Sequence, residues 1–428
     1  MAKITVNTAS KIKKMKPMHG GGQPPVVSSA KATHFHYLTE AGIPYSRLHD
    51  VGGSFGGGKY VDIPNVFRSF DADENDPASY DFTFTDHLLG LLVEAGVEPY
   101  YRLGITIENA VKVKPYFVFP PKDYEKWARI CEHIIRHYTE GWADGFHYRI
   151  TYWEIWNEPD NKQMWLGTPE EYYRLYDVTA KHLKSCFGDK IMVGGYASCG
   201  FYAVAGGGNP WSTKPPEADI HWVDYFHGFM KYVKEHNSPI DFFSWHSYAP
   251  TANTVRMDAW LHEQLVAYGY GDLPTHLNEW DPYAEELGTG HHSAEIAATV
   301  IALQHGYVSL ACIYDMRISD APYCPLFNPI KNKPIHGYYA LVAFNTLYQL
   351  GTQVESTSDT EGLYALAASD GTRCAMMISN LTGTDQELCL DGVDLSTARF
   401  HVIDDDRLLS WAPNASTIGK NTVLLVEW

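Results

Sequence analysis

The stretch TYWEIWNEPDN, residues 151–161, places three carboxylates and two tryptophans close together. Carboxylates beside indole rings are typical of proteins that bind and cleave sugars, because the rings pack against sugar faces while the acids move protons. Glu158 lies at the expected end of a strand, where Pro159 stops the backbone ladder, so it is the acid placed to meet a substrate. Glu154 comes earlier in the strand and is expected to be buried. Asp160 is expected in the following loop, solvated or acting as a cap.

A second carboxylate follows another apolar run. Residues 275–282, THLNEWDP, repeat the arrangement of an asparagine, a glutamate, an aromatic residue and a proline. Glu279 follows Glu158 by 279 − 158 = 121 residues, or three strand–helix units. In a closed eight-stranded barrel, the two side chains would converge across the lumen. Two facing carboxylates are what glycosidic bond cleavage needs, with a separation of roughly 5 Å when configuration is retained.

The elements that must position these acids alternate along most of the chain. Short apolar runs precede longer amphipathic segments about eight times, which favours a closed (β/α)8 TIM barrel over an open doubly wound sheet. The predicted strands are residues 16–20, 44–51, 97–105, 150–158, 191–196, 240–248, 274–280 and 309–316. The predicted helices are residues 83–96, 122–142, 168–188, 221–237, 254–269, 291–306 and 335–351.

The alternation stops near Gly351. Residues 351–428 contain short strand patterns separated by Asp-Gly and Asn/Ser turns, which are typical of an antiparallel β-sandwich. Residues 1–14 include one more such strand and are expected to join this sandwich, leaving residues 15–350 as the barrel. The predicted fold class is therefore α/β, a TIM barrel with a C-terminal antiparallel β-sandwich domain.

Composition narrows the class of protein. The net charge of −18 argues against a nucleic-acid or anionic-membrane surface, and no run is long enough to span a bilayer. The seven cysteines are odd in number and never form a Cys-x-x-Cys pair, which indicates reduced thiols. The N-terminus lacks the apolar core of a signal peptide. We expect a cytoplasmic protein, or a secreted one if a signal has been removed.

Two patterns that suggest other ligands are weak. The stretch GSFGGGKY, residues 53–60, nearly matches a phosphate-binding loop, but Tyr60 stands where Ser or Thr would hold magnesium. We expect a flexible loop over the barrel mouth instead. The histidines of residues 34–36 and 291–292 are not spaced to place both rings on one helix face, so no metal and no cofactor are expected.

The motifs together resemble a known family. WEIWNEPD (153–160) and HLNEWD (276–281) are similar to the retaining glycoside hydrolases of clan A. With SRLHD (46–50) and DFFSWHSY (241–248), the chain resembles glycoside hydrolase family 39, the β-xylosidase and α-L-iduronidase family. The resemblance covers essentially the whole chain, including the sandwich.

The resemblance implies roles for the two glutamates and their neighbour. Glu158 is similar to the family's acid/base and Glu279 to its nucleophile. Asn157 is similar to the residue that hydrogen-bonds the sugar 2-hydroxyl. The chemistry requires Glu158 to stay protonated until it donates, whereas a cation near Glu279 is expected to lower the pKa of that carboxyl.

Further roles are implied on other strands. Tyr248 resembles the tyrosine that steadies the nucleophile, and His246 and His49 resemble sugar-contacting histidines. Arg47 resembles the arginine that keeps the nucleophile ionised; the alternative is a buried counter-ion of Glu154, and the two roles are compatible. His246 and Tyr248 have the alternative of being barrel-rim residues.

The aromatic residues near these strands suggest sugar contacts. Trp280 and Tyr283 are candidates for a stacking wall, and Trp165 for the lining of an outer subsite. Asp315 is suited to a sugar contact or to a structural role.

We therefore predict a retaining glycoside hydrolase, most similar to an exo-acting β-xylosidase on plant or microbial oligosaccharides. An α-L-arabinofuranosidase, a β-glucosidase or β-galactosidase, and an endo-acting enzyme are alternatives. A non-catalytic sugar-binding barrel would have lost one glutamate, and a barrel for phosphorylated metabolites would carry a glycine-rich phosphate cradle. The expected partner is a glycoside or oligosaccharide, and the sequence is also compatible with a homo-oligomer.

Overall fold

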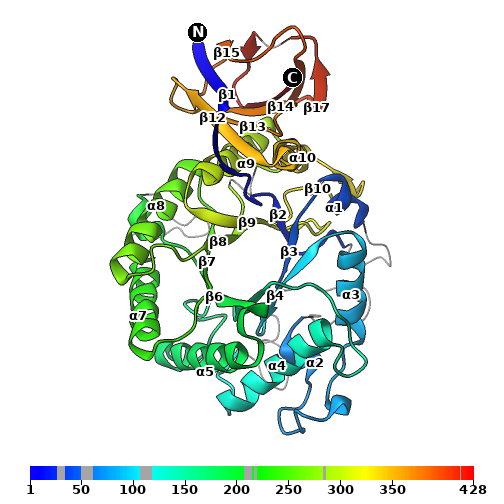
Figure 1. The fold of residues 1–428 in the computed structure, drawn as a ribbon, viewed down its shortest axis with the longest axis vertical. Coiled ribbons are helices and arrows are strands. Elements are labelled where there is room, and N and C mark those ends of the chain that lie inside the picture. Colours follow the sequence, from blue (N-terminus) through cyan, green and yellow to red (C-terminus); the bar gives the residue numbers. More distant parts are fainter. Residues whose placement is uncertain are drawn as a thin grey trace.

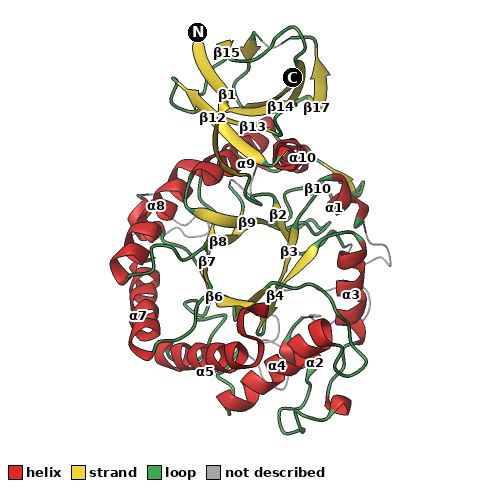
Figure 2. Ribbon diagram, viewed as in Figure 1, coloured by secondary structure: helices red, strands yellow, loops and turns green. Residues whose placement is uncertain are grey.

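A computed structural model describes residues 1–26, 34–49, 61–106, 118–206, 215, 219–282, 286–414 and 416–428. Within these ranges, eight parallel strands close into a barrel that helices surround (Figures 1 and 2). This arrangement confirms the predicted barrel. Its strands are β2 (Gly20–Gly22), β3 (Tyr45–Leu48), β4 (Glu98–Leu103), β5 (Tyr152–Ile155), β6 (Met192–Ser198), β7 (Phe242–Ser247), β8 (Thr275–Trp280) and β9 (Val308–Tyr314). The helices are α1 (His36–Glu40), α2 (Ile63–Val66), α3 (Thr83–Glu94), α4 (Tyr124–Glu140), α5 (Pro169–Phe187), α6 (Tyr202–Ala205), α7 (Ile220–His236), α8 (Thr251–Tyr268), α9 (Gly290–His305) and α10 (His336–Leu350).

The first barrel strand consists of three glycines, so its predicted position at residues 16–20 was wrong. A Cβ atom at Gly21 would lie 2.2 Å from Met316 Sδ, and one at Gly20 would lie 2.7 Å from the carbonyl oxygen of Ala311. β2 pairs with both β3 and β9 and thereby closes the barrel. Because these glycines have no side chains, an apolar pattern could not reveal the strand.

The sequence itself sets the limits of α5. The Thr168 hydroxyl accepts a hydrogen bond from the Glu171 amide, and the Glu171 carboxylate accepts one from the Thr168 amide. This capping box is followed by Pro169, which needs no amide partner in the first turn. The helix ends at Phe187, and the next residue, Gly188, has a φ of +55° that suits a residue without a Cβ atom.

A nine-stranded sheet lies against one side of the barrel (Figure 1). Its order is β17-β16-β19-β14-β13-β12-β1-β15-β18. The N-terminal strand β1 pairs antiparallel with β12 and parallel with β15, so both ends of the chain lie in this sheet. The strands are β1 (Ala2–Lys14), β12 (Thr352–Ser358), β13 (Leu363–Ser369), β14 (Cys374–Asn380), β15 (Gln386–Asp391), β16 (Arg399–Asp404), β17 (Arg407–Ala412), β18 (Thr417–Ile418) and β19 (Thr422–Glu427). A separate hairpin joins β10 (Phe327–Asn328) and β11 (Lys333–Pro334).

Both faces of this sheet bury apolar side chains. One face packs on α9 and α10, where Met377 and Leu425 join the main core of the barrel. The other face curls around a second core that includes Ile4, Met376 and Val426. Two apolar layers are what a sandwich attached to a barrel requires, and the predicted fold class is confirmed.

Some predictions about the chain are not tested by the described residues. The limits assigned to the three units, 1–14, 15–350 and 351–428, stay predictions. The expected loop at residues 53–60 and Tyr283 lie outside the described residues. No helix in the ranges given above has both the length and the apolar character needed to cross a membrane.

Two glycine substitutions test how tightly the barrel packs. A Cβ atom at Gly194, in β6, would lie 2.3 Å from the carbonyl oxygen of Phe242. Gly194→Ala should therefore lower the free energy of unfolding by about 1–3 kcal/mol. At Gly90, in α3, a Cβ atom would meet only the Tyr148 hydroxyl at 3.6 Å, so Gly90→Ala should be neutral or stabilising by up to about 1 kcal/mol. Equal effects of the two changes in urea unfolding would contradict this packing.

Candidate active site

One arginine joins several strands at the C-terminal face of the barrel. Arg47, on β3, donates from Nε and Nη2 to Glu154 Oε2 over 2.8 and 2.6 Å. It also donates from Nη1 to Glu279 Oε1 over 2.7 Å and from Nη2 to Asn157 Oδ1 over 2.6 Å. All four side chains are buried. The rigid fork of guanidinium donors thus fixes residues of β3, β5 and β8 relative to one another. The predicted pairing of Arg47 with Glu154 is confirmed.

Glu154 is the fully buried counter-ion of this arginine. Its Oε1 accepts a hydrogen bond from Asn278 Nδ2, which also lies 3.4 Å from the Tyr100 hydroxyl. Burial opposes the charge of Arg47, but Glu154 and Glu279 outweigh it and raise the pKa of the guanidinium. Glu154 is buried, as predicted, and balances the charge of Arg47.

The two glutamates predicted to face each other are brought together around a histidine. His246 Nδ1, from β7, lies 2.8 Å from Glu158 Oε1 and 3.4 Å from Glu279 Oε2. One oxygen of each carboxylate and a ring nitrogen of His246 all lie within 4.8 Å of one another. The hydroxyl of Tyr248 donates to Glu279 Oε2 over 2.9 Å. Arg47 and Tyr248 together occupy both oxygens of Glu279 and fix the orientation of its carboxylate.

Glu158 is carried on a turn beyond the strand. β5 ends at Ile155, so the predicted strand of residues 150–158 was too long. Trp156 and Glu158 have φ angles of +72° and +46°, which are uncommon for residues other than glycine. The Glu158 amide donates to the carbonyl oxygen of Ala197 at the end of β6. Such left-handed backbone is common at functional sites, where surrounding contacts hold it.

An irregular stretch of β8 places two neighbouring side chains in the same interior. Asn278 reaches Glu154, and Glu279 reaches Arg47, although strict alternation would point one of them outward. The pairing of β8 with both β7 and β9 shifts register in this region. A bulge of this kind re-aims a side chain and explains how an adjacent Asn-Glu pair can serve one site.

The order of the two carboxyl pKa values differs from the expectation. Burial and the charge of Glu158 raise the pKa of Glu279 above its ordinary value, although His246 and Arg47 pull it down. Burial also acts on Glu158, but the hydrogen bond and charge of His246 outweigh it and lower the pKa of Glu158. The two carboxylates in turn raise the pKa of His246 despite its burial. The three groups therefore titrate as one set that shares protons.

Asp160 lies in the predicted loop, and of the two roles expected for it there, solvated or capping, the solvated one was wrong. The carboxylate is buried and accepts hydrogen bonds from Ser198 Oγ over 2.9 Å and from the Cys199 amide over 3.1 Å. The chain after Pro159 folds back over the end of β6, which removes this carboxylate from water. Burial and the charge of Glu158 raise the pKa of Asp160 to about 7.

The other residues predicted to contact sugar, His49, Trp280 and Trp165, are all buried. His49 is buried, and its Nε2 lies 3.4 Å from Asn157 Nδ2. Trp280 is also buried at the end of β8, and its contact with a sugar stays a prediction. Trp165 packs edge-on against Trp156 and is only 3% exposed, so the structure places it in the core rather than in an open subsite.

Asp315 has structural partners, and its contact with a sugar stays a prediction. Its carboxylate accepts hydrogen bonds from the Arg317 guanidinium and from the Cys324 thiol. The side chain of Asp315 is fully buried in these contacts.

Two positioning residues carried no predicted role. Asn278 links Glu154 to the rest of the network, and the hydroxyl of Tyr202 accepts a hydrogen bond from the Tyr248 amide. The repeated Asn-Glu pair at residues 157–158 and 278–279 was a usable signal for Asn278. No sequence pattern connects Tyr202 with the barrel strand after it.

Two groups of side chains in the described residues hold potential metal-ligating atoms close together. The first is Glu158, His246 and Glu279. In this group Arg47 and Tyr248 already satisfy Glu279, so the arrangement suits proton transfer and attack on carbon better than metal binding. The second group, Glu132, His182 and Cys186, lies between α4 and α5, on the outside of the barrel.

Comparison with known proteins bears on this site. The family model of the glycosyl hydrolases family 39 matches residues 3–306. The chain belongs to this family. A β-xylosidase of Geobacillus stearothermophilus is 27% identical over 321 residues, which are 68% of this chain and 58% of the relative. A β-xylosidase of Caldicellulosiruptor saccharolyticus is 27% identical over 290 residues, 61% of this chain and 51% of that protein. This family 39 chain thus aligns with little more than half the length of these relatives.

Solved structures share the fold. A glucosidase from Croceicoccus marinus has a TM-score of 0.74 and 21% identity, and the match covers 100% of this chain and 98% of that one. A family 39 β-xylosidase from Caulobacter crescentus has a TM-score of 0.71 and 18% identity, with 100% and 99% covered. The likeness extends over the barrel and the sheet together.

The buried carboxylate of Asp160 predicts a pH-dependent stability. An unfolded Asp ionises near 3.8, whereas Asp160 in the folded chain ionises at about 7. Between these values the folded state binds more protons than the unfolded state, so this group loses stabilising effect as pH rises from about 4 to 7. The side chain of Asp160→Asn cannot titrate, so the variant should not show this decrease in stability with rising pH. The Tm of the variant minus that of the wild type should increase across this window and stay level above it. A Tm difference that does not change with pH would contradict the assignment.

Proposed function

We propose that this chain is a retaining glycoside hydrolase in which Glu279 is the nucleophile and Glu158 the acid/base. The observation that carries the proposal is that one oxygen of Glu158 and one oxygen of Glu279 lie within 4.8 Å of each other, around His246. Retaining glycosidases have carboxyl groups about 5–5.5 Å apart, whereas inverting enzymes need about 6.5–9.5 Å to admit water.

The assignment of the two roles follows from their contacts. Glu279 accepts hydrogen bonds from Arg47 and Tyr248, which hold a carboxylate in one orientation for attack. Glu158 is hydrogen-bonded to His246 Nδ1, to the side chain of Cys199 and, more distantly, to Asn161 Nδ2, so it can exchange a proton with the histidine. A proton shared along the bond from His246 to Glu158 can therefore be delivered as the substrate arrives.

In the first step a Glu279 oxygen bonds to the anomeric carbon as the glycosidic carbon–oxygen bond breaks. The departing oxygen takes that electron pair and the proton of Glu158. In the second step Glu158 removes a proton from water, the water oxygen bonds to the anomeric carbon, and Glu279 leaves as a carboxylate. Arg47 stays paired with Glu154 throughout, so the cation is never left alone.

Two ring nitrogens support the sugar contacts proposed for the histidines. Within the described part of the chain, His246 Nε2 and His49 Nδ1 are buried and have no hydrogen-bond partner. Buried polar atoms in folded proteins normally have partners, so hydroxyl groups of a bound sugar would complete these two. We assign Asn157, held by Arg47 and beside His49, to the same sugar.

We propose β-xylosides as the substrates and removal of terminal residues as the mode of action. The support is the name of the two relatives that are 27% identical. The alternatives are α-L-arabinofuranosides, β-glucosides or β-galactosides, and internal cleavage of a polysaccharide. The seven free cysteines support a cytoplasmic location, which is also a proposal.

The two glutamate roles predict different rescue products. Glu158→Ala should slow hydrolysis of xylobiose by about 10²–10⁴-fold but affect a dinitrophenyl β-xyloside much less, because that leaving group needs no proton. Azide should restore turnover of the activated substrate and give the β-xylosyl azide. Glu279→Ala should lose all hydrolysis, and azide should give the α-xylosyl azide.

Glu263→Ala, on the exposed surface of α8, is the control and should match the wild type. The azide products can be assigned by NMR. If both site variants gave the same anomer, the roles assigned to Glu158 and Glu279 would be wrong.

A panel of aryl glycosides tests the substrate separately. The value of kcat/KM should be highest for the β-xyloside and at least about tenfold lower for the β-glucoside, whose extra hydroxymethyl group must be accommodated. A higher kcat/KM for an α-L-arabinofuranoside or a β-galactoside would replace the β-xyloside assignment without affecting the proposed mechanism.

A further inference from the structure

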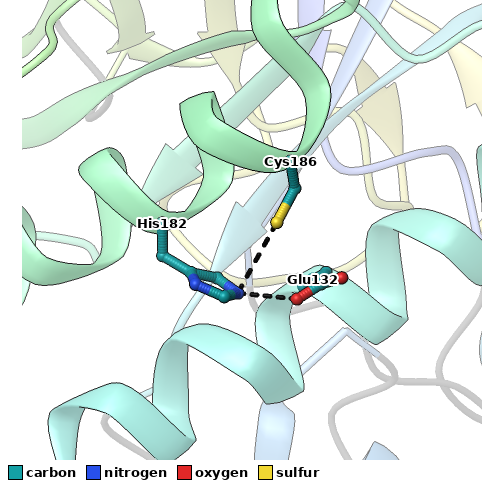
Figure 3. A group of neighbouring side chains, drawn as sticks. All are labelled: Glu132, His182 and Cys186. Atoms are coloured by element: carbon teal, nitrogen blue, oxygen red, sulfur yellow. Dashed lines mark hydrogen bonds and ion pairs between the residues drawn. The ribbon is translucent and has the colours of Figure 1, made fainter.

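A second group of potential ligands lies far from the barrel mouth, between two neighbouring outer helices. Glu132 comes from α4, and His182 and Cys186 come from successive turns of α5 (Figure 3). His182 Nε2 lies 2.6 Å from Glu132 Oε2 and 3.8 Å from Cys186 Sγ. The carboxylate oxygen, the ring nitrogen and the sulfur all lie within 4.8 Å of one another. From this geometry we infer that Glu132, His182 and Cys186 form a binding site for a divalent transition-metal ion of the zinc class.

The distances are close to those of a tetrahedral site. Zinc bonds of about 2.3 Å to sulfur and 2.0–2.1 Å to nitrogen place the two ligand atoms roughly 3.6 Å apart. The distance from Cys186 Sγ to His182 Nε2 is 3.8 Å already. The distance from Glu132 to His182 has to lengthen by somewhat less than 1 Å, a change that a half-buried glutamate can make by rotation. Three protein ligands leave a fourth position for water.

The identity of the ligands selects the kind of ion. A thiolate and an imidazole favour zinc, cobalt or nickel, whereas magnesium and calcium prefer sites built from oxygen alone. With a thiolate and a carboxylate, a divalent ion makes the group neutral. His182 and Cys186 are four residues apart on one helix and therefore project from the same face.

Two neighbouring groups act on the site in different ways: the end of α5 attracts a cation, whereas Arg136 orients a ligand although its own positive charge opposes a bound ion. Arg136 Nε donates to Glu132 Oε1 over 2.7 Å, which orients the carboxylate and leaves Oε2 directed at His182. Ligating carboxylates in metal sites are commonly held in this way. Arg136 is itself fixed over the ring of Phe187. Cys186 also lies in the last turn of α5, where the unpaired carbonyl groups attract positive charge.

A bound ion would tie α4 to α5, the helices that follow β4 and β5. The site therefore predicts stabilisation by metal without a direct role in catalysis. A simple ion pair between His182 and Glu132 is the competing explanation of the same geometry. That pair needs no sulfur, so substitutions at Cys186 separate the two.

Cobalt binding to the full chain provides the test. Added Co²⁺ should produce the near-ultraviolet absorption of a sulfur–cobalt bond with one equivalent bound, and Zn²⁺ should abolish it by displacement. Cys186→Ser keeps the His182–Glu132 pair and should lose this band. Cys374→Ser is the matched control, because Cys374 is also half-buried and belongs to neither group of ligating atoms found in the described residues.

Thermal unfolding gives an independent readout. Zn²⁺ at saturating concentration should raise the Tm of the wild type and of Cys374→Ser by about 2–4 °C, and of Cys186→Ser or His182→Gln by much less. The inference is overturned if Co²⁺ gives no sulfur band, if the band persists in Cys186→Ser, or if all four proteins respond to Zn²⁺ alike.

Discussion

The site depends on one buried cation. Arg47 binds Glu154, Glu279 and Asn157 at the same time, and burial makes any unpaired charge among them costly. Glu154 neutralises the arginine, so the negative charge of Glu279 must be balanced elsewhere. His246, between Glu279 and Glu158, is the group that can do so. The protonation of the two acids is therefore linked through one histidine and one arginine.

This network requires side chains that regular strands could not supply. Asn278 and Glu279 are neighbours, and both face the interior because β8 is irregular where it pairs with β7 and β9. Glu158 reaches His246 from the chain beyond β5, where Trp156 and Glu158 have left-handed backbone. The closed barrel supplies strands that meet at one face, and these local departures from regular geometry place the reacting groups there.

Much of this could be predicted from residue types and spacing. Apolar runs in regular alternation predicted the barrel, and the repeated Asn-Glu pair singled out Glu158, just beyond β5, and Glu279, on β8. The strand of glycines at residues 20–22 could not be predicted, because its signal is the absence of side chains. The burial of Asp160 and the order of the two glutamate pKa values depend on how loops fold over β6 and on distances among three titratable groups. The spacing of residues along the chain shows neither the path of these loops nor these distances.

The central claim is that Glu279 bonds to the anomeric carbon. Reaction with a 2-deoxy-2-fluoro-β-xylosyl fluoride slows the second step and should leave one fluoroxylosyl group on the protein. Mass spectrometry of the intact chain and of its peptides should place this group on Glu279. A label on Glu158, or turnover of the reagent without any covalent intermediate in a protein that hydrolyses aryl β-xylosides, would contradict the account.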